Sequence, residues 1–136
     1  MTRKLAGLLL LAVCLLVAGC GQSTSRREAK KYPVRGTVTL DGQPVPEATI
    51  YFKTIATGAL DFASIKDGKF EGQAQDGDRR VEVSCTKTEV QESGGMKTEV
   101  QKELIPTKYN TDPSNTLKAT VSPQGPNEFK FELTSQ

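Results

Sequence analysis

Apolar and polar side chains alternate in short runs along most of the chain after residue 33. Alternation over four to eight residues is typical of a β-strand with one buried face. Gly-, Pro- and Asp-containing turns separate these runs. The predicted strands are 34–40, 48–52, 62–65, 69–73, 81–85, 117–121 and 129–133. Short strands at this spacing predict an all-β fold, an antiparallel seven-stranded Greek-key β-sandwich.

The first two runs flank the segment DGQPVP, residues 41–46. Its first two residues, Asp-Gly, are a dipeptide typical of hairpin turns. Its two prolines cannot donate ladder hydrogen bonds, so the second strand cannot begin before about Glu47. We therefore interpret this segment as a turn of the fold, with Val45 tucked inward, and not as a binding loop.

One segment fits two structures. The sequence KTEVQE at residues 87–92 is nearly repeated as KTEVQK at residues 97–102, with SGGM between them. Two such arms would pair as a polar hairpin across the Gly-Gly loop. Met96, Val100 and Leu104 instead have the spacing of a short amphipathic helix. We favour the hairpin, and in either structure the segment Lys87–Lys102 would project from the sandwich where a partner could dock.

The N-terminal residues have the pattern of a signal peptide. Arg3 and Lys4 precede an apolar run of about 14 residues, which is shorter than the roughly 18–20 residues that span a bilayer. The run ends in the sequence LVAGC, in which small residues precede Cys20. These residues resemble a bacterial lipobox, which implies cleavage before Cys20.

The lipobox resemblance implies that Cys20 carries a diacylglycerol group and an amide-linked acyl chain such as palmitate. One acyl chain binds a membrane weakly, whereas more than one chain anchors a protein stably. Gly21, in place of an Asp, favours delivery to the outer membrane over retention at the inner membrane. The expected organisation is a signal peptide over 1–19, the lipidated cysteine and a flexible basic tether over 20–32, and the sandwich domain over 33–136.

The charge balance argues against a nucleic-acid partner. The full chain has 18 basic and 16 acidic residues, and removal of Arg3 and Lys4 leaves 16 of each. A nucleic-acid-binding domain needs a strongly basic face, which a near-neutral chain does not predict. The tether is locally basic around Arg26, Arg27 and Lys30, so it could either lie on anionic headgroups or simply be solvated.

The cysteine and histidine content limits the chemistry of the mature chain. Cys14 leaves with the signal peptide and Cys20 is expected to carry lipid, so Cys85 remains unpaired and no disulfide is predicted. Cys85 alternates with Val81 and Val83, which predicts a small core side chain. The chain has no histidine, the usual general base and the commonest zinc ligand. We therefore expect no catalytic residues, no cofactor and no metal.

Calcium binding and glycan binding stay open as alternatives. Aspartates at the turns could approach one another at one end of the sandwich and share a Ca²⁺ ion, although no complete calcium-loop motif is present. The candidate ligands are Asp67, Asp76 and Asp78. Tyrosines could form part of a surface for a saccharide or a protein. The candidates are Tyr32, Tyr51 and Tyr109. An envelope enzyme of unknown reaction is the remaining alternative.

Several segments resemble carboxypeptidase regulatory-like domains. The sequence VRGTVTLDGQPVPEATI at 34–50 resembles the opening hairpin of that group, and DGKF at 67–70 resembles its turn into a later strand. Arg80 departs from the group, which has a tyrosine at that position. The segments 105–113, 117–121 and 127–133 resemble the C-terminal part of small bacterial lipoproteins in the group. The resemblance implies a transthyretin-like (prealbumin-like) sandwich in the cell envelope and leaves the activity open.

These patterns together predict a lipid-anchored protein of the cell envelope. Its sandwich would be a non-catalytic binding or structural module, held to the membrane through lipid on Cys20. The expected partner is an envelope protein or a glycan.

Overall fold

The structure is a computed structural model that describes residues 29–136. The all-β prediction is confirmed, since the described chain consists of strands and turns with one short 3₁₀ segment, η1 (Thr107–Tyr109). The strands of the sandwich are β1 (Lys31–Leu40), β2 (Gln43–Pro44), β3 (Glu47–Lys53), β4 (Leu60–Lys66), β5 (Lys69–Gln75), β6 (Gly77–Ser84), β9 (Lys118–Val121) and β10 (Glu128–Leu133). Two further strands, β7 (Thr86–Ser93) and β8 (Met96–Glu103), form a separate ribbon.

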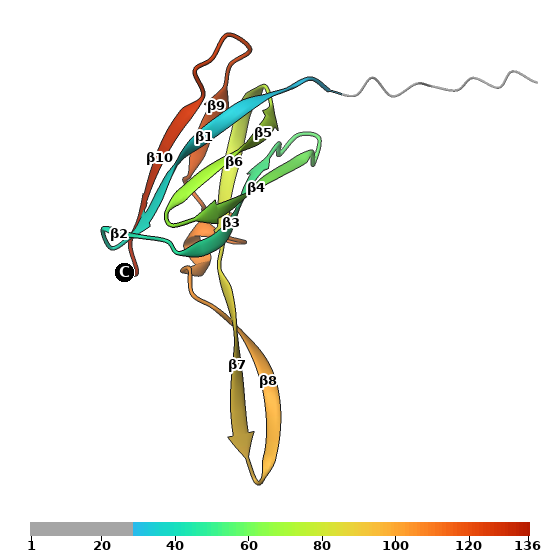
Figure 1. Cartoon of the computed structure of the whole chain (residues 1–136). Coiled ribbons are helices and arrows are strands. Elements are labelled where there is room, and N and C mark those ends of the chain that lie inside the picture. The colour runs from blue at the N-terminus through green and yellow to red at the C-terminus, as the bar shows by residue number, and fades with distance from the viewer. Residues whose placement is uncertain (1–28) are drawn as a thin grey trace, which may run out of the picture.

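The strands of the sandwich follow the order β10-β1-β5-β4-β3-β6-β9. Neighbours along this order are antiparallel, except that β1 and β10 are parallel. β4 and β5 are in register at two pairs beside their turn, Ile65 with Phe70 and Lys66 with Lys69. The sheet curls around its inner face (Figure 1), consistent with the predicted antiparallel β-sandwich.

Each of the seven predicted strands is present, and the differences lie at the strand ends. β1 begins at Lys31, before the predicted start of the domain, because Lys31 and Tyr32 pair with the end of β5. β4 begins at Leu60 instead of Phe62. Apolar alternation cannot mark such ends when the outermost side chains are polar or face solvent.

Aromatic side chains link the two sides of the curled sheet. Phe52 in β3 is fully buried, and its ring lies 6.0 Å from the ring of Phe70 in β5 and 6.3 Å from that of Phe129 in β10. The ring of Phe131 lies 6.3 Å from that of Phe70. Burial of one such side chain contributes about 1.5–3 kcal/mol, so this cluster stabilises the contact between β3 and the β1–β5–β10 side.

The DGQPVP segment is a turn, as predicted. Asp41 and Gly42 have φ values of 50° and 79°, which places both in the left-handed region of a tight hairpin turn. The chain then pairs back on β1 as the two-residue strand β2. Val45 is buried and β3 begins at Glu47, as predicted. The short pairing of Gln43 and Pro44 with β1 precedes the strand start that the prolines predict.

The topology separates the two ends of the sandwich. Four antiparallel steps, from β1 through β5, β4 and β3 to β6, make β1 and β6 run in the same direction. β1 begins at Lys31, and β6 ends at Ser84 where the chain leaves for the ribbon. The N-terminal segment therefore joins the sandwich at one end and the ribbon leaves it at the other (Figure 1).

Candidate functional site

The segment Lys87–Lys102 is a β-hairpin, as predicted in preference to a helix. β7 and β8 pair from Thr86 with Glu103 to Ser93 with Met96. The Gly-Gly turn has φ values of 60° and 80°, which glycine adopts without strain. We call residues 86–103 the ribbon; it projects from the sandwich as a two-stranded sheet of its own (Figure 1).

The carboxylate of Glu103 fixes the base of the ribbon. Its Oε1 atom accepts hydrogen bonds from the backbone N–H groups of Cys85, at 2.7 Å, and Ile105, at 3.1 Å. Its Oε2 atom accepts from the hydroxyl of Ser84, at 2.6 Å, and from the side-chain amide of Asn110, at 3.2 Å. One side chain thus ties β6, the ribbon and the segment after η1 together.

These hydrogen bonds also set the charge of Glu103. Burial raises the pKa of its carboxyl group, but the hydrogen bonds from Ser84, Cys85 and Ile105 outweigh burial, so the pKa is lowered overall. Hydrogen bonds to an ionised acceptor are stronger than neutral ones. Sequence reasoning missed Glu103, because its partners are backbone groups and a hydroxyl 19 positions away.

The rest of the ribbon is solvent-exposed and carries no covering layer. Val90 and Met96 are 61% and 74% exposed, and Val100 is half-buried. Glu89 and Lys102 lie 3.8 Å apart across the strands. Within residues 29–136, no third strand pairs with β7 or β8. Both edges therefore present unpaired N–H and C=O groups, which are a template for another strand.

A second exposed surface lies on the outer face of β3 and β4. Tyr51 and Phe62 are directly opposite each other across these strands, with ring centroids 6.5 Å apart. Phe62 points outward because its neighbours Asp61 and Ala63 occupy the buried positions, and it is 67% exposed. The exposure of Phe62 could not be predicted from the sequence, because this residue lies in the short apolar run 62–65. Such a run does not show which side chains face inward.

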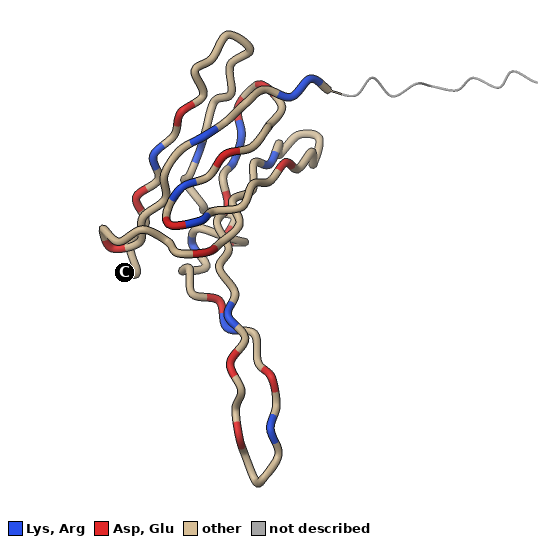
Figure 2. The backbone as a smooth tube through the Cα atoms, in the orientation of Figure 1, with Lys and Arg blue, Asp and Glu red and all other residues tan. Residues whose placement is uncertain are grey.

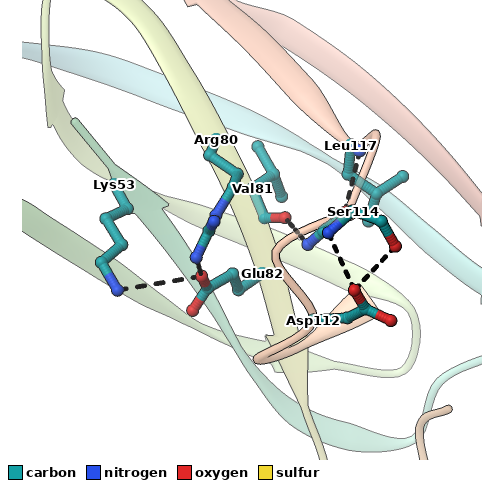
Figure 3. A network of polar contacts seen from close by, with 8 residues as sticks. Lys53, Arg80, Val81, Glu82, Asp112, Ser114 and Leu117 are labelled. Atoms are coloured by element: carbon teal, nitrogen blue, oxygen red, sulfur yellow. Dashed lines mark hydrogen bonds and ion pairs between the residues drawn. The ribbon is translucent and has the colours of Figure 1, made fainter. Parts of the chain in front are cut away.

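An ion-paired network borders this aromatic pair. Glu82, which lies opposite Tyr51 on β6, is nearly buried, and Arg80 and Lys53 point toward its carboxylate (Figure 3). Arg80 forms an ion pair with it, and the Lys53 Nζ atom lies 3.9 Å from its Oε1 atom. The network holds two cationic groups beside the ring of Tyr51, where they could donate hydrogen bonds to a polar ligand.

Hydrogen bonds fix the loop that lies near this network (Figure 3). The side-chain amide of Asn115 donates to the Val81 carbonyl at 2.8 Å, and its oxygen accepts from the Leu117 N–H at 2.9 Å. Asp112 accepts from both the N–H and the hydroxyl of Ser114, which lowers the pKa of its carboxyl group. These contacts are structural, because they lie within the loop or join it to β6.

An open groove of about 770 Å³ lies on the outer face of the β10, β1, β5 and β4 strands. Its charged lining residues are Arg35, Lys66, Lys69, Glu71, Glu128 and Lys130. Arg35 is ion-paired with Glu128, and Lys130 lies 2.7 Å from Glu132. Basic and acidic residues are interspersed along the described backbone (Figure 2), so the groove has mixed charge.

The structure does not bring the three candidate calcium ligands together. Asp67 precedes β5 and Asp76 follows it, so the length of a strand separates them. Asp78 Oδ1 instead accepts a hydrogen bond from the Thr120 hydroxyl at 2.7 Å. Within residues 29–136, no group of three or more acidic, cysteine or histidine side chains could hold a metal ion.

The three candidate tyrosines also lie apart. Tyr51 faces outward on β3, whereas Tyr32 packs against the core at the start of β1. The hydroxyl of Tyr109, in η1, accepts the Thr134 N–H at 3.1 Å, so this ring packs against the C-terminal segment. Of the three, Tyr51 is the one that belongs to an exposed aromatic pair.

Cys85 is a core side chain, as predicted. It is buried, and its thiol donates a hydrogen bond to the Glu47 carbonyl at 2.9 Å. Burial raises the pKa of this thiol, and the charges of Glu103 and Glu47 raise it further. The thiol is therefore protonated and unreactive at neutral pH.

An ion pair between a half-exposed lysine and a buried carboxylate holds the start of β1. Asp61 is buried, and its Oδ1 atom lies 2.8 Å from the Lys31 ammonium group. Its Oδ2 atom accepts the Gln75 N–H at 2.9 Å, and the Gln75 carbonyl accepts from Arg79 Nε at 3.0 Å. Lys31 was predicted to belong to the tether, and here it is part of the sandwich. Cys20 and the predicted signal peptide lie outside the described residues.

No protein-family model, curated protein or solved structure matches the chain. Among residues 29–136, no helix is long and apolar enough to cross a membrane.

Proposed function

We propose that the protein is a lipid-anchored component of the cell envelope and that its sandwich is a non-catalytic scaffold which presents the ribbon to a binding partner. The expected partner is another envelope protein. The proposal combines the lipobox-like sequence at Cys20 with the carboxypeptidase regulatory-like pattern of residues 34–50.

The observation that carries this proposal is the position of the ribbon. It leaves the sandwich at the end opposite to the start of β1, and Glu103 fixes its base with four hydrogen bonds. Each arm has eight residues, so the ribbon extends about 25 Å at roughly 3.3 Å per residue. An anchor at the N-terminal side would thus hold the ribbon away from the membrane surface.

The ribbon also has the features of a binding element. It buries no apolar face, and isolated two-stranded hairpins are marginally stable in water. The ribbon has a firmly bonded base and two free edges. Its stability would increase if another strand or surface covered it.

Metabolic labelling tests the anchor. Cells that express the full chain are grown with a labelled fatty acid, and the wild type is compared with Cys20→Ala. We expect label on the wild type and none on the variant, which should leave the membrane fraction. Equal labelling of the two proteins, or unchanged membrane association, would contradict lipidation at Cys20.

Capture from envelope extracts tests the binding role. In one variant, Asn-Gly replaces residues 87–102, so that a two-residue turn keeps Thr86 opposite Glu103. We expect the full chain to retain envelope proteins that this variant loses, while both proteins unfold at similar temperatures. Identical captured sets would overturn the role of the ribbon.

A second candidate function, glycan binding, is favoured by the exposed Phe62 ring and the half-buried Tyr51 ring beside Arg80 and Lys53. Sugar rings stack on such aromatic faces while cationic groups donate hydrogen bonds to hydroxyls. Phe62→Ala should then lower retention on an envelope polysaccharide, and Val90→Ala, an exposed change on the ribbon, should not. Equal retention of Phe62→Ala and the wild type would reject this candidate.

A further inference from the structure

The free edge of β8 has a sequence that is complementary to itself. Residues 96–100 read Met-Lys-Thr-Glu-Val. Aligned antiparallel with a second copy and centred on Thr98, this segment places Lys97 opposite Glu99 and Met96 opposite Val100, each pair twice. The central pair is Thr98 with Thr98. Opposite charges and apolar groups directly across two strands stabilise their pairing.

The side-chain directions agree with this alignment. Successive side chains of a strand point to opposite faces, so Met96, Thr98 and Val100 share one face and the two charged residues share the other. In the alignment each apolar pair and each ion pair therefore lies on a single face. Met96 is 74% exposed in the single chain, and pairing would cover it. Lys97 and Glu99 are both exposed, and neither has an ion-pair partner among the described residues.

We propose that the ribbon pairs with the ribbon of a second copy of this chain, β8 against β8 about a two-fold axis at Thr98. The product is a four-stranded antiparallel sheet in the order β7-β8-β8-β7. This inference names a partner for the ribbon and so rests on its proposed role as the binding element, but it does not depend on the lipid anchor.

Neighbouring registers and the other edge fit less well. Two-fold pairing centred on Glu99 would oppose two like charges, which is destabilising. In β7 the equivalent alignment is centred on Thr88 and places Thr86, a polar residue, where β8 has Met96. That alignment also lies at the base of the ribbon, beside Ser84 and Cys85 of the sandwich, whereas residues 96–100 lie at the free end.

Charged residues on a strand edge commonly prevent pairing. Lys97 and Glu99 do not have that effect here, because they are of opposite sign and placed symmetrically about Thr98, so each meets its opposite in the second copy. The antiparallel arrangement places the two sandwiches at opposite ends of the joined ribbons. The alignment brings together residues 96–100 of each copy, far fewer than the roughly 20–30 residues a side of stable interfaces, so the pairing is reversible and concentration-dependent.

Disulfide trapping tests the register. In the full chain, purified in detergent, Thr98→Cys places two thiols across the axis, where directly opposite residues lie about 4.5–5.5 Å apart between Cα atoms. This separation is within the range that a disulfide spans. We expect a cross-linked dimer on mild oxidation. The matched control is Thr88→Cys, the same change at the equivalent position of β7, which should stay monomeric.

Charge exchange tests the chemistry of the contact. In the Thr98→Cys background, Lys97→Glu alone and Glu99→Lys alone should each lose the cross-linked dimer, and a mixture of the two should restore it as a heterodimer. Dimer that persists in both single variants would show random collision. Either that result or a mixture that fails to restore the dimer would overturn the proposal.

The two proposals fail separately. If Thr98→Cys gives no more dimer than Thr88→Cys while the ribbon still captures an envelope protein from extracts, self-pairing is wrong and the binding role stands. If both experiments are negative, both proposals are wrong.

Discussion

Glu103 is the residue on which the orientation of the ribbon depends. Its carboxylate accepts four hydrogen bonds from groups that belong to three different parts of the chain. Replacement by glutamine keeps the shape but removes the charge and turns one acceptor into a donor, which then meets another donor. We expect Glu103→Gln to lower the free energy of unfolding by about 1–3 kcal/mol in denaturant titration. Glu92→Gln, an exposed change on the paired strand β7, should have an effect within about 0.5 kcal/mol.

The lowered pKa of Glu103 predicts a pH dependence. A carboxyl group whose pKa is lower in the folded state stabilises the protein fully above its unfolded pKa. That contribution is lost as the pH falls through the folded value. The difference in stability between the wild type and Glu103→Gln should therefore shrink in acid, below the ordinary pKa of a glutamate. If the difference in the free energy of unfolding stays constant across this pH range, Glu103 is not ionised in the folded state and the prediction is wrong.

Gly36 marks the closest approach of two strands. It pairs with Phe129 where β1 and β10 run parallel, and a Cβ atom at this position would overlap the Phe129 carbonyl and lie 2.9 Å from the Phe70 ring. Backbone cannot give way as a flexible side chain can. We expect Gly36→Ala to lower the free energy of unfolding by about 3 kcal/mol or more, measured by thermal or denaturant unfolding. Thr37→Ala, on the solvent side of the same strand, is the control and should be nearly neutral.

The ribbon and the sandwich differ as elements in what stabilises them. The strands of the sandwich share a buried core, whereas the ribbon has cross-strand hydrogen bonds and few apolar contacts. Local opening should therefore cost less free energy in β7 and β8 than in β1, β3 or β6. Hydrogen exchange at low protein concentration should show faster exchange of the ribbon amides. If the ribbon amides are protected from exchange as strongly as those of the core strands, the ribbon does not open independently of the sandwich and the prediction is wrong.

The strands and turns of this fold could be predicted from the sequence, because alternation and the Gly and Pro positions are local signals. The hairpin at 87–102 followed from its repeat and its Gly-Gly turn. The functional details depended on tertiary contacts instead. Phe62 faces outward because Asp61 beside it faces inward to Lys31, and Glu103 accepts two of its hydrogen bonds from Ser84 and Cys85, which lie 19 and 18 positions earlier. Both contacts join residues that are distant in sequence, so a local sequence pattern does not reveal them.

At the scale of the whole molecule, β1 and β6 run in the same direction. This determines which part of the protein lies farthest from the start of β1 and is open to a partner. The start of β1 and the ribbon lie at opposite ends of a sandwich whose strands bridge the distance. Other outward features, the Tyr51–Phe62 pair and the mixed-charge groove, lie along its sides. The ribbon is thus the part that a partner meets first if Cys20 is held at a membrane.

Photo-cross-linking in living cells tests this central claim most directly. A photoreactive residue is placed at Val90 on the ribbon or, as control, at Thr37 on the exposed side of β1, in the full chain with its N-terminal segment intact. We predict a discrete cross-linked product from Val90 in the envelope fraction, either with a second copy or with another envelope protein, and none from Thr37. No product from Val90, or the same product from both positions, would contradict the claim that the ribbon is the binding element.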